Sequence, residues 1–424
     1  MIPLRLEEIV DLGLGRLEVG RSGAVITGIE ADSREVGAGD LFVAINTGRE
    51  FVDDARGRGA ATLVPDDQEA ALAALASLVR SKSTARVVAV VGSTGKTSTK
   101  DILGALCAPH ARTVWAERSL NNEIGVPLTV FRLEPDTEVL VTEMGMRGLG
   151  QIAALCAVAR PGVAIVTHIG PEHLELLGAV ERVAKANAEA IAALPSGGVA
   201  VVPAAASELE PYLEREDIEV RRFAAEDLEF EDGHGRFGVG GTVVELDLPF
   251  TQAHQAVNTL AALHAYDALG LPLDRADEGA RDIRLSPWRG EELPLPGGGL
   301  VINDAYNANP DSMRAALLHL VERAGGCRRV AILGEMAELG DASEDFHRGI
   351  GELAVELEVE VIGVGERARL YGPVLWAADD ERAVSAARAF LQPGDAVLVK
   401  ASRAVGLEGI AQEIANFAEA WSLS

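Results

Sequence analysis

The residues best suited to chemistry lie in the segment VVAVVGSTGKTSTKD, residues 87–101. Its five apolar residues predict a buried strand that runs into a glycine-bearing turn and then into a helix. Unpaired backbone N–H groups and the helix dipole at such a turn attract an anion. Lys96 would then reach the β- and γ-phosphates of a nucleotide, and the Thr97 hydroxyl would hold Mg²⁺. The segment therefore predicts a site for a nucleoside triphosphate.

The predicted nucleotide-contacting residues of this turn and helix start are Gly92, Ser93, Thr94, Gly95, Lys96, Thr97 and Ser98. The full P-loop pattern has a glycine where this chain has Val90. The alternative is a glycine turn with a surface lysine, which the strand before it and the helix after it disfavour.

Two more polar side chains follow predicted strands. Glu143 comes directly after a strand at 139–142, and a carboxylate beside the phosphates suits Mg²⁺. His173 follows a strand at 163–167 after a short turn and could complete a metal or phosphate site. Taken alone, Glu143 could be a solvated charge at the end of a strand, and His173 could be a residue at the start of a helix. Their shared place at the carboxyl ends of strands, where ligands bind in parallel sheets, favours the functional interpretation.

Two amide-rich segments offer hydrogen bonds to a polar ligand. NNEIGVPLT begins with Asn121 and Asn122, which suit a polar substrate or, equally, caps for their own backbone. In NDAYNANPDS, Asp304 could hold a ribose hydroxyl, and Asn307 and Asn309 offer amide groups. Taken alone, this second segment is a turn before a capped helix.

The elements that must position these residues follow a strand-then-helix rhythm. Strands are predicted at 39–45, 87–91, 139–142, 163–167, 199–202, 300–303, 329–333, 360–364 and 396–400. Helices are predicted near 69–79, 151–159, 179–194, 312–323, 346–357 and 380–390. This alternation indicates an α/β fold with largely parallel sheets. A polar linker at 81–84 and a proline- and glycine-rich passage at 286–299 divide the chain.

Composition narrows the classes of function. The net charge of −27 argues against nucleic acid as a general partner. No apolar run is long enough to predict a membrane span, and the first residues show no signal-peptide pattern, so we expect a cytoplasmic protein without a membrane partner. The three cysteines lack metal-ligand spacing. Lysine is rare, and three of its five positions fall in segments that we predict to be functional: Lys96, Lys100 and Lys400.

Together the motifs resemble a known family. GSTGKTSTKD, NNEIGVPLT, TEMG, EHLELLG, NDAYNANPDSM, LGEMAELG and VKASR occur in this order over nearly the whole chain. That order resembles the Mur ligases, and within them the branch that adds D-alanyl-D-alanine to UDP-N-acetylmuramoyl-tripeptide. The resemblance implies an N-terminal UDP-substrate domain at 1–83, a central P-loop parallel-sheet domain at 84–288 and a C-terminal Rossmann-like domain at 289–424.

The resemblance also implies an activity. These enzymes are amide ligases that use ATP and Mg²⁺ to convert a carboxylate into an acyl phosphate, which an amine then attacks. By matched position, Lys96, Glu143 and His173 would be catalytic. Thr97 and Glu143 would bind Mg²⁺, and His173 would hold a second Mg²⁺. The further contacts implied with nucleotide are Asn258, Arg289, Asp304 and Asn307. The substrate contacts implied are Ser33, Arg34, Asn121, Asn122, Asn309, Lys400, Ser402 and Arg403. We expect small-molecule substrates and a monomer.

The chain departs from the family pattern at named positions. Asn187 stands where the family usually carries a lysine modified to a carbamate, and Arg118 and Ser119 replace a usual glycine–asparagine pair. The N-terminal region also lacks a usual loop after Gly48. Two alternatives stay open: another amide ligase of the superfamily, of the folylpolyglutamate or cyanophycin type, and a catalytically silent paralogue that binds nucleotide.

Overall fold

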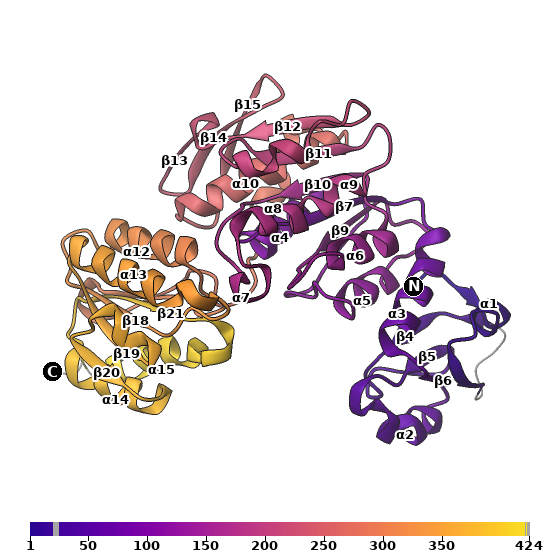
Figure 1. The fold of residues 1–424 in the computed structure, drawn as a ribbon, viewed down its shortest axis with the longest axis horizontal. Coiled ribbons are helices and arrows are strands. Elements are labelled where there is room, and N and C mark those ends of the chain that lie inside the picture. Colours follow the sequence, from indigo (N-terminus) through magenta and orange to yellow (C-terminus); the bar gives the residue numbers. More distant parts are fainter. Residues whose placement is uncertain (20–24, 420, 422–424) are drawn as a thin grey trace. The chain divides into compact units, whose positions relative to one another are not determined.

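The computed structural model describes residues 1–19, 25–419 and 421 of the 424-residue chain (Figure 1). The chain divides into two compact units. Unit one comprises Met1–His168, Lys185–Pro249 and Val257–Arg284, and unit two comprises Ile169–Ala184, Phe250–Ala256 and Leu285–Ser424. The three-domain boundaries at 1–83, 84–288 and 289–424 stay a prediction.

The first part of unit one contains two small sheets. The larger has the strand order β2-β6-β5-β4, in which β4, β5 and β6 are parallel and β2 is antiparallel to β6. Its strands and the antiparallel pair β1 and β3 span Leu4–Arg5 (β1), Gly15–Glu18 (β2), Val25–Ile26 (β3), Gly28–Glu30 (β4), Asp40–Val43 (β5) and Ala61–Pro65 (β6). The helices span Leu6–Val10 (α1), Val52–Gly57 (α2) and Gln68–Ser81 (α3). The strand predicted at 39–45 and the helix predicted at 69–79 are confirmed by β5 and α3.

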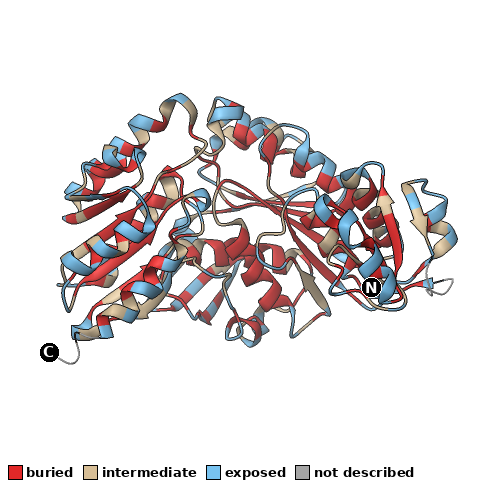
Figure 2. Ribbon diagram, turned by 90° about the horizontal axis from the view of Figure 1, so that it is seen from below, coloured by how far each residue is buried: buried red, intermediate tan, exposed pale blue. Residues whose placement is uncertain are grey.

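The main sheet of unit one is fully parallel, with the order β12-β11-β10-β7-β9-β8. Its strands span Arg86–Val91 (β7), Thr113–Trp115 (β8), Val139–Glu143 (β9), Val163–Val166 (β10), Val199–Pro203 (β11) and Glu219–Phe223 (β12). The inner strands are buried over most of their length (Figure 2), which explains their continuous apolar runs. All four strands predicted for this region are confirmed.

The helices of this part of unit one span Lys96–Cys107 (α4), Gly125–Phe131 (α5), Gln151–Ala159 (α6), Glu189–Ala192 (α9) and Asp277–Ala280 (α11). Two further helices, Val180–Asn187 (α8) and Ala253–Ala268 (α10), begin in unit two and end in unit one. The helix predicted at 179–194 is interrupted at Ala188. The interruption lies next to Glu189, whose carboxylate accepts the N–H groups of Gly150 and Ala153 at the start of α6.

A small antiparallel sheet was not expected from the sequence. It spans Leu228–Glu231 (β13), His234–Val239 (β14) and Thr242–Asp247 (β15), in the order β13-β14-β15. Tight turns at Asp232-Gly233 and Gly240-Gly241, all with positive φ, join the three strands.

Unit two is built on a second six-stranded sheet, in the order β16-β17-β21-β18-β19-β20, in which β16 alone is antiparallel to its neighbour. The strands span Glu291–Pro294 (β16), Leu300–Asn303 (β17), Arg329–Leu333 (β18), Val359–Val364 (β19), Leu375–Ala377 (β20) and Ala396–Lys400 (β21). The helices span Leu174–Leu177 (α7), Pro310–Ala324 (α12), Ser343–Glu356 (α13), Asp380–Phe390 (α14) and Ile410–Ala418 (α15). The four strands and three helices predicted here are confirmed, to within a few residues at their ends.

Helices cover both faces of this second sheet. On β18, Ala331 and Leu333 belong to the apolar cluster with α12 and α13, whereas Val330 and Ile332 belong to the cluster with α14 and α15. This alternation follows from the period of two along a strand. The α/β fold with a largely parallel sheet that was predicted from the sequence is therefore confirmed in this region.

Across the described residues, no helix is both long enough and apolar enough to cross a lipid bilayer.

Candidate active site

The phosphate loop, residues 92–97, joins β7 to α4 in unit one. Gly92 and Gly95 adopt φ values of +129° and +84°, which residues with a side chain rarely adopt. The Thr167 hydroxyl lies within hydrogen-bond distance of the carbonyl oxygens of Val91 and Thr94, and the Ser93 N–H donates to the His168 carbonyl over 2.8 Å. The end of β10 therefore holds the phosphate loop in its shape.

The phosphate loop presents donors that suit an anion. Gly95 is the N-cap residue of α4 and has no side chain to accept hydrogen bonds from the first turn. Lys96 bends back over the loop, with its ammonium group against the carbonyl oxygen of Gly92. A Cβ atom on Gly95 would lie 2.4 Å from Asn258 Oδ1, so the Asn258 amide is in direct contact with the loop. A cation, a helix N-terminus and an amide thus meet at one place, as a bound phosphate requires.

Two oxygen ligands for a metal ion lie next to the phosphate loop. Glu143 ends β9 opposite Val90 of β7, and its side chain is 1% exposed. Asn121 Nδ2 donates to Glu143 Oε1 over 2.8 Å, while Oε2 is buried and has no hydrogen-bond partner among the described residues. Thr97 is also 1% exposed, and its hydroxyl lies 3.0 Å from that of Ser119.

These donors fit ATP and Mg²⁺. A buried carboxylate oxygen without a partner is costly unless a cation meets it, and hydroxyl and carboxylate oxygens are hard ligands of the kind Mg²⁺ takes. No three His, Cys, Asp or Glu side chains within the described ranges gather closely enough to hold a metal by themselves. A Mg²⁺ ion held by Thr97 and Glu143 would share its coordination sphere with phosphate oxygens and water, as is usual for this ion.

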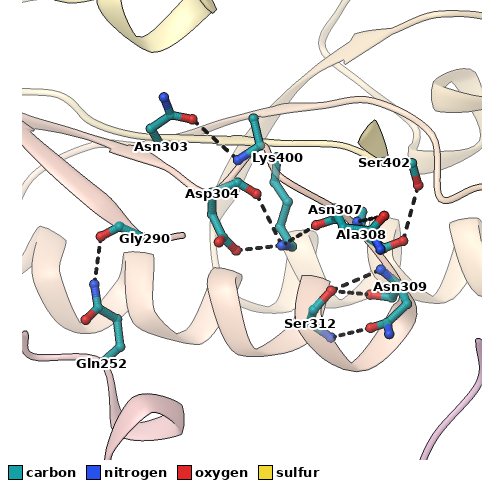
Figure 3. A network of polar contacts seen from close by, with 11 residues as sticks. Gln252, Gly290, Asn303, Asp304, Asn307, Ala308, Asn309, Ser312, Lys400 and Ser402 are labelled. Atoms are coloured by element: carbon teal, nitrogen blue, oxygen red, sulfur yellow. Dashed lines mark hydrogen bonds and ion pairs between the residues drawn. The ribbon is translucent and has the colours of Figure 1, made fainter. Parts of the chain in front are cut away.

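Unit two holds a separate polar network around Lys400 (Figure 3). The Lys400 ammonium, at the end of β21, contacts Asp304 Oδ2 over 2.5 Å and the carbonyl oxygen of Asn307 over 2.9 Å. The Lys400 residue is 2% exposed, whereas the Asp304 side chain is 18% exposed, so this ion pair is partly buried. Lys400, Asp304 and Asn307, which were predicted from two distant segments, are thus brought together. The Lys400 ammonium group binds the Asp304 carboxylate and the Asn307 carbonyl.

The other predicted amides and Ser402 also make local contacts. Asn309 Oδ1 caps α12 by accepting the Ser312 N–H over 2.9 Å (Figure 3). Asn122 Oδ1 accepts the Gly125 N–H at the start of α5, over 2.9 Å. The Ser402 hydroxyl donates to the Ala308 carbonyl and accepts the Ala337 N–H over 2.8 Å. The capping alternative left open by the sequence is therefore present at Asn122 and Asn309.

His173 is part of unit two and is paired with a carboxylate. Its Nδ1 atom contacts Glu338 Oε2, and both residues adopt positive φ values, +49° and +61°. The backbone of Glu175 also donates to the Glu338 carbonyl over 3.2 Å. A carboxylate on one ring nitrogen fixes the histidine's orientation. The other nitrogen, Nε2, is the candidate metal ligand and lies 3.9 Å from Glu172 Oε2.

Arginine side chains stack on aromatic rings in the segments that adjoin the Lys400 network in the chain. Arg289 lies 4.1 Å above the Tyr306 ring, and Arg403 lies 4.7 Å above the Trp288 ring. Arg403 also pairs with Glu408 over 2.7 Å. Stacking of this kind orders a guanidinium group without using its hydrogen-bond donors.

In the N-terminal part, Ser33 is buried and Arg34 is exposed. The Arg34 guanidinium forms a two-pronged contact with Asp32, and these hydrogen bonds lower the pKa of Asp32 to about 2. The roles predicted for Ser33 and Arg34 stay predictions.

Sequence reasoning missed several residues that position candidate ligands: Lys100, Ser119 and Thr167 in unit one and Glu338 in unit two. For Lys100 a signal was present, because lysine is rare in this chain and falls mainly in functional segments. The other three are single polar residues whose contacts depend on the tertiary fold.

Comparison with known proteins identifies the family. The Mur ligase middle domain matches residues 90–266, and the Mur ligase glutamate ligase domain matches residues 288–403. The chain belongs to the Mur ligase family. The phosphate loop, Glu143 and His173 lie in the first matched region, and the Lys400 network lies in the second.

Relatives of this Mur ligase cover most of its length. The UDP-N-acetylmuramoyl-tripeptide–D-alanyl-D-alanine ligase of Escherichia coli (strain K12) is 33% identical over 403 residues, which cover 87% of each chain. A crystal structure of MurF from Acinetobacter baumannii superposes with a TM-score of 0.85 at 25% identity, covering 98% of this chain and 99% of that one. MurF ligase from Thermotoga maritima in complex with ADP gives a TM-score of 0.81 at 27% identity, covering 93% of this chain and 98% of that one. The Mur ligase fold predicted from the sequence is confirmed.

Proposed function

We propose that this Mur ligase joins D-alanyl-D-alanine to UDP-N-acetylmuramoyl-tripeptide, with ATP converted to ADP and phosphate, in the synthesis of peptidoglycan precursors. The observation that carries the proposal is the match over 87% of the chain to the E. coli ligase of that name. The phosphate loop and the partnerless oxygen of Glu143 support the use of ATP and Mg²⁺.

The residues of unit one suit the phosphoryl-transfer half of the reaction. ATP supplies the phosphoryl group that makes a carboxylate reactive toward an amine. The N–H groups at the start of α4 and the Lys96 ammonium would hold the phosphates and stabilise charge as it develops on them. Thr97 and Glu143 would hold Mg²⁺, each oriented by a neighbouring side chain.

The remaining residue assignments are part of the proposal. Asn258, Arg289, Asp304 and Asn307 would contact the nucleotide, and His173, oriented by Glu338, would hold a second Mg²⁺. Ser33, Arg34, Asn121, Asn122, Asn309, Lys400, Ser402 and Arg403 would contact or position the two substrates. We also propose that the enzyme acts in the cytoplasm as a monomer.

The test is ADP formation by the purified chain with ATP, Mg²⁺ and UDP-N-acetylmuramoyl-tripeptide, with and without D-alanyl-D-alanine. We expect ADP to form only when both substrates are present, together with a pentapeptide product of the correct mass. The matched control is L-alanyl-L-alanine, which has the same charge and composition. Equal ADP formation with both dipeptides, or none with either, would contradict the proposed substrate.

A further inference from the structure

Lys100 is a fully buried lysine in the helix that follows the phosphate loop. It lies one turn after Lys96 on α4, and its side chain is 0% exposed. Its ammonium group donates to the carbonyl oxygens of Ala116 and Arg118 over 2.7 and 2.9 Å, and it pairs with Asp101 Oδ1 over 2.5 Å. The three acceptors match the three N–H donors of a lysine. A buried charge with this arrangement holds two pieces of chain together.

The segment that Lys100 holds is residues 116–121, here called the strap, which connects β8 toward α5. Arg118 in the strap has a φ of +49°, a left-handed conformation that residues with a Cβ atom rarely adopt. Trp115, just before the strap, packs on α4 where a Cβ on Gly104 would lie 2.6 Å from the indole ring. The strap is thus drawn closely onto α4, with a local backbone cost that the ammonium contacts offset.

The strap contacts both predicted Mg²⁺ ligands of unit one. The Ser119 hydroxyl lies 3.0 Å from the Thr97 hydroxyl. Asn121 Nδ2 donates to Glu143 Oε1 over 2.8 Å, and the Asn121 carbonyl accepts the Gly145 N–H over 2.8 Å. The strap therefore fixes which oxygen of the Glu143 carboxylate is occupied and which is left without a partner.

We propose that Lys100 is a positioning residue for the metal–nucleotide site, acting through the strap on Thr97 and Glu143. The inference rests on the proposed use of ATP and Mg²⁺, but not on the identity of the two substrates. Lys100 itself contacts carbonyl and carboxylate groups of the protein. Groups that orient metal ligands in this way typically contribute 10–100-fold to metal affinity.

The experiment measures ADP affinity by calorimetry, once with Mg²⁺ and once with EDTA, for the full chain and its variants. Lys100→Met keeps the apolar stem and removes the ammonium group. Lys82→Met is the matched control, because Lys82 is a partly exposed lysine that pairs with Glu8 far along the chain from the strap. Thermal unfolding of each variant separates loss of stability from loss of metal preference.

We expect Mg²⁺ to tighten ADP binding to the parent and Lys82→Met equally. In Lys100→Met this tightening falls by about tenfold, while the affinity in EDTA, which depends on the phosphate loop, stays within about twofold. Ser119→Ala keeps the Lys100 contacts. In this variant the tightening of ADP binding by Mg²⁺ falls less, by about threefold.

A lower melting temperature with an unchanged Mg²⁺ effect would overturn the proposal, because it would show that Lys100 only stabilises the fold. If Lys100→Met does not fold, Lys100→Met/Asp101→Asn removes the negative charge of Asp101 as well and takes its place. Should that variant also fail, Ser119→Ala and Asn121→Ala decide: an unchanged Mg²⁺ effect in both overturns the proposal.

Failure of the proposed function would be distinguishable. A parent that binds ADP with Mg²⁺ but makes no pentapeptide refutes the proposed substrates and leaves this measurement intact. A parent that binds no ADP refutes nucleotide use and this proposal together.

Discussion

The phosphate loop of unit one and the Lys400 network of unit two differ in how their polar groups are satisfied. At the phosphate loop, backbone N–H groups and a lysine lie next to a buried carboxylate, and Glu143 Oε2 has no partner among the described residues. Around Lys400, the cation, the Asp304 carboxylate and the turn at Asn307 already contact one another.

This difference indicates two kinds of contribution to a site. A buried polar atom without a partner is expensive, so its persistence at the phosphate loop points to a ligand that completes it. A buried network with its contacts in place contributes rigidity and holds other groups in position. Four substitutions or conditions would break or sharpen this comparison.

The largest effect is expected from Lys96→Ala at the phosphate loop. Removing the cation that faces the phosphates should lower kcat/KM for ATP by about 10²–10³-fold, with little change in melting temperature, because Lys96 supports the ligand more than the fold. Steady-state ADP formation measures this, with Lys82→Ala as the surface-lysine control. If kcat/KM for ATP fell by less than about threefold, the phosphate loop would not contact the transferred phosphate.

Lys400→Met should act mainly on stability. The change leaves the half-buried Asp304 carboxylate without its cation, which costs at most about 3–5 kcal/mol of folding free energy, the range for a fully buried pair. Urea unfolding measures this cost, and Lys400→Met/Asp304→Asn should recover part of it. A variant of unchanged stability with a raised KM for D-alanyl-D-alanine would instead support the dipeptide contact predicted from the sequence.

The ion pairs of Glu292 with His319 and Arg323 in unit two predict a pH dependence of stability. Burial raises the pKa of Glu292, but hydrogen bonds from His319 and Arg323 outweigh it and lower that pKa from 4.5 to about 2. The stabilisation is therefore present above about pH 4.5 and is lost as the pH falls toward 2, by up to about 3 kcal/mol. Between pH 5 and 2, the free energy of unfolding should change less with pH in Glu292→Gln than in the parent. An equal pH dependence in both proteins would contradict this origin.

The sequence predicted the main strands and the phosphate loop because their signals are local. Continuous apolar runs of β7 and β9, followed by glycine or a carboxylate, occur within a few residues of one another. The small sheet β13-β14-β15 was not predicted, although its Asp232-Gly233 turn is a hairpin signal.

The positioning contacts could not be predicted, for a physical reason. The pairing of His173 with Glu338 joins residues far apart in the chain and requires left-handed backbone at both. The contacts of Lys100 depend on the same conformation at Arg118, where nothing in the residue type favours it. Asn122 and Asn309 show the other limit: an amide suits a substrate and a helix cap equally, and only the folded contacts reveal the cap.

The smallest of the four effects is expected from Gly95→Ala, which tests whether the phosphate loop depends on its backbone shape. The new Cβ would lie 2.4 Å from Asn258 Oδ1 at a φ of +84°, so the loop or the amide must shift. We expect ADP binding to weaken by about tenfold, as measured by calorimetry, because misplaced N–H groups lose the phosphate. Gly57→Ala is the matched control, since its Cβ would meet no atom within 4 Å at the end of α2 and should stabilise the chain by about 0.4–1 kcal/mol. Gly95→Ala/Asn258→Ala is compared with Asn258→Ala alone, because Asn258 is itself a proposed nucleotide contact. Equal affinity of these two variants would assign the loss to the collision, and a further loss in the double variant would assign it to backbone strain. An unaffected Gly95→Ala variant would contradict the idea that this loop is preorganised for phosphate.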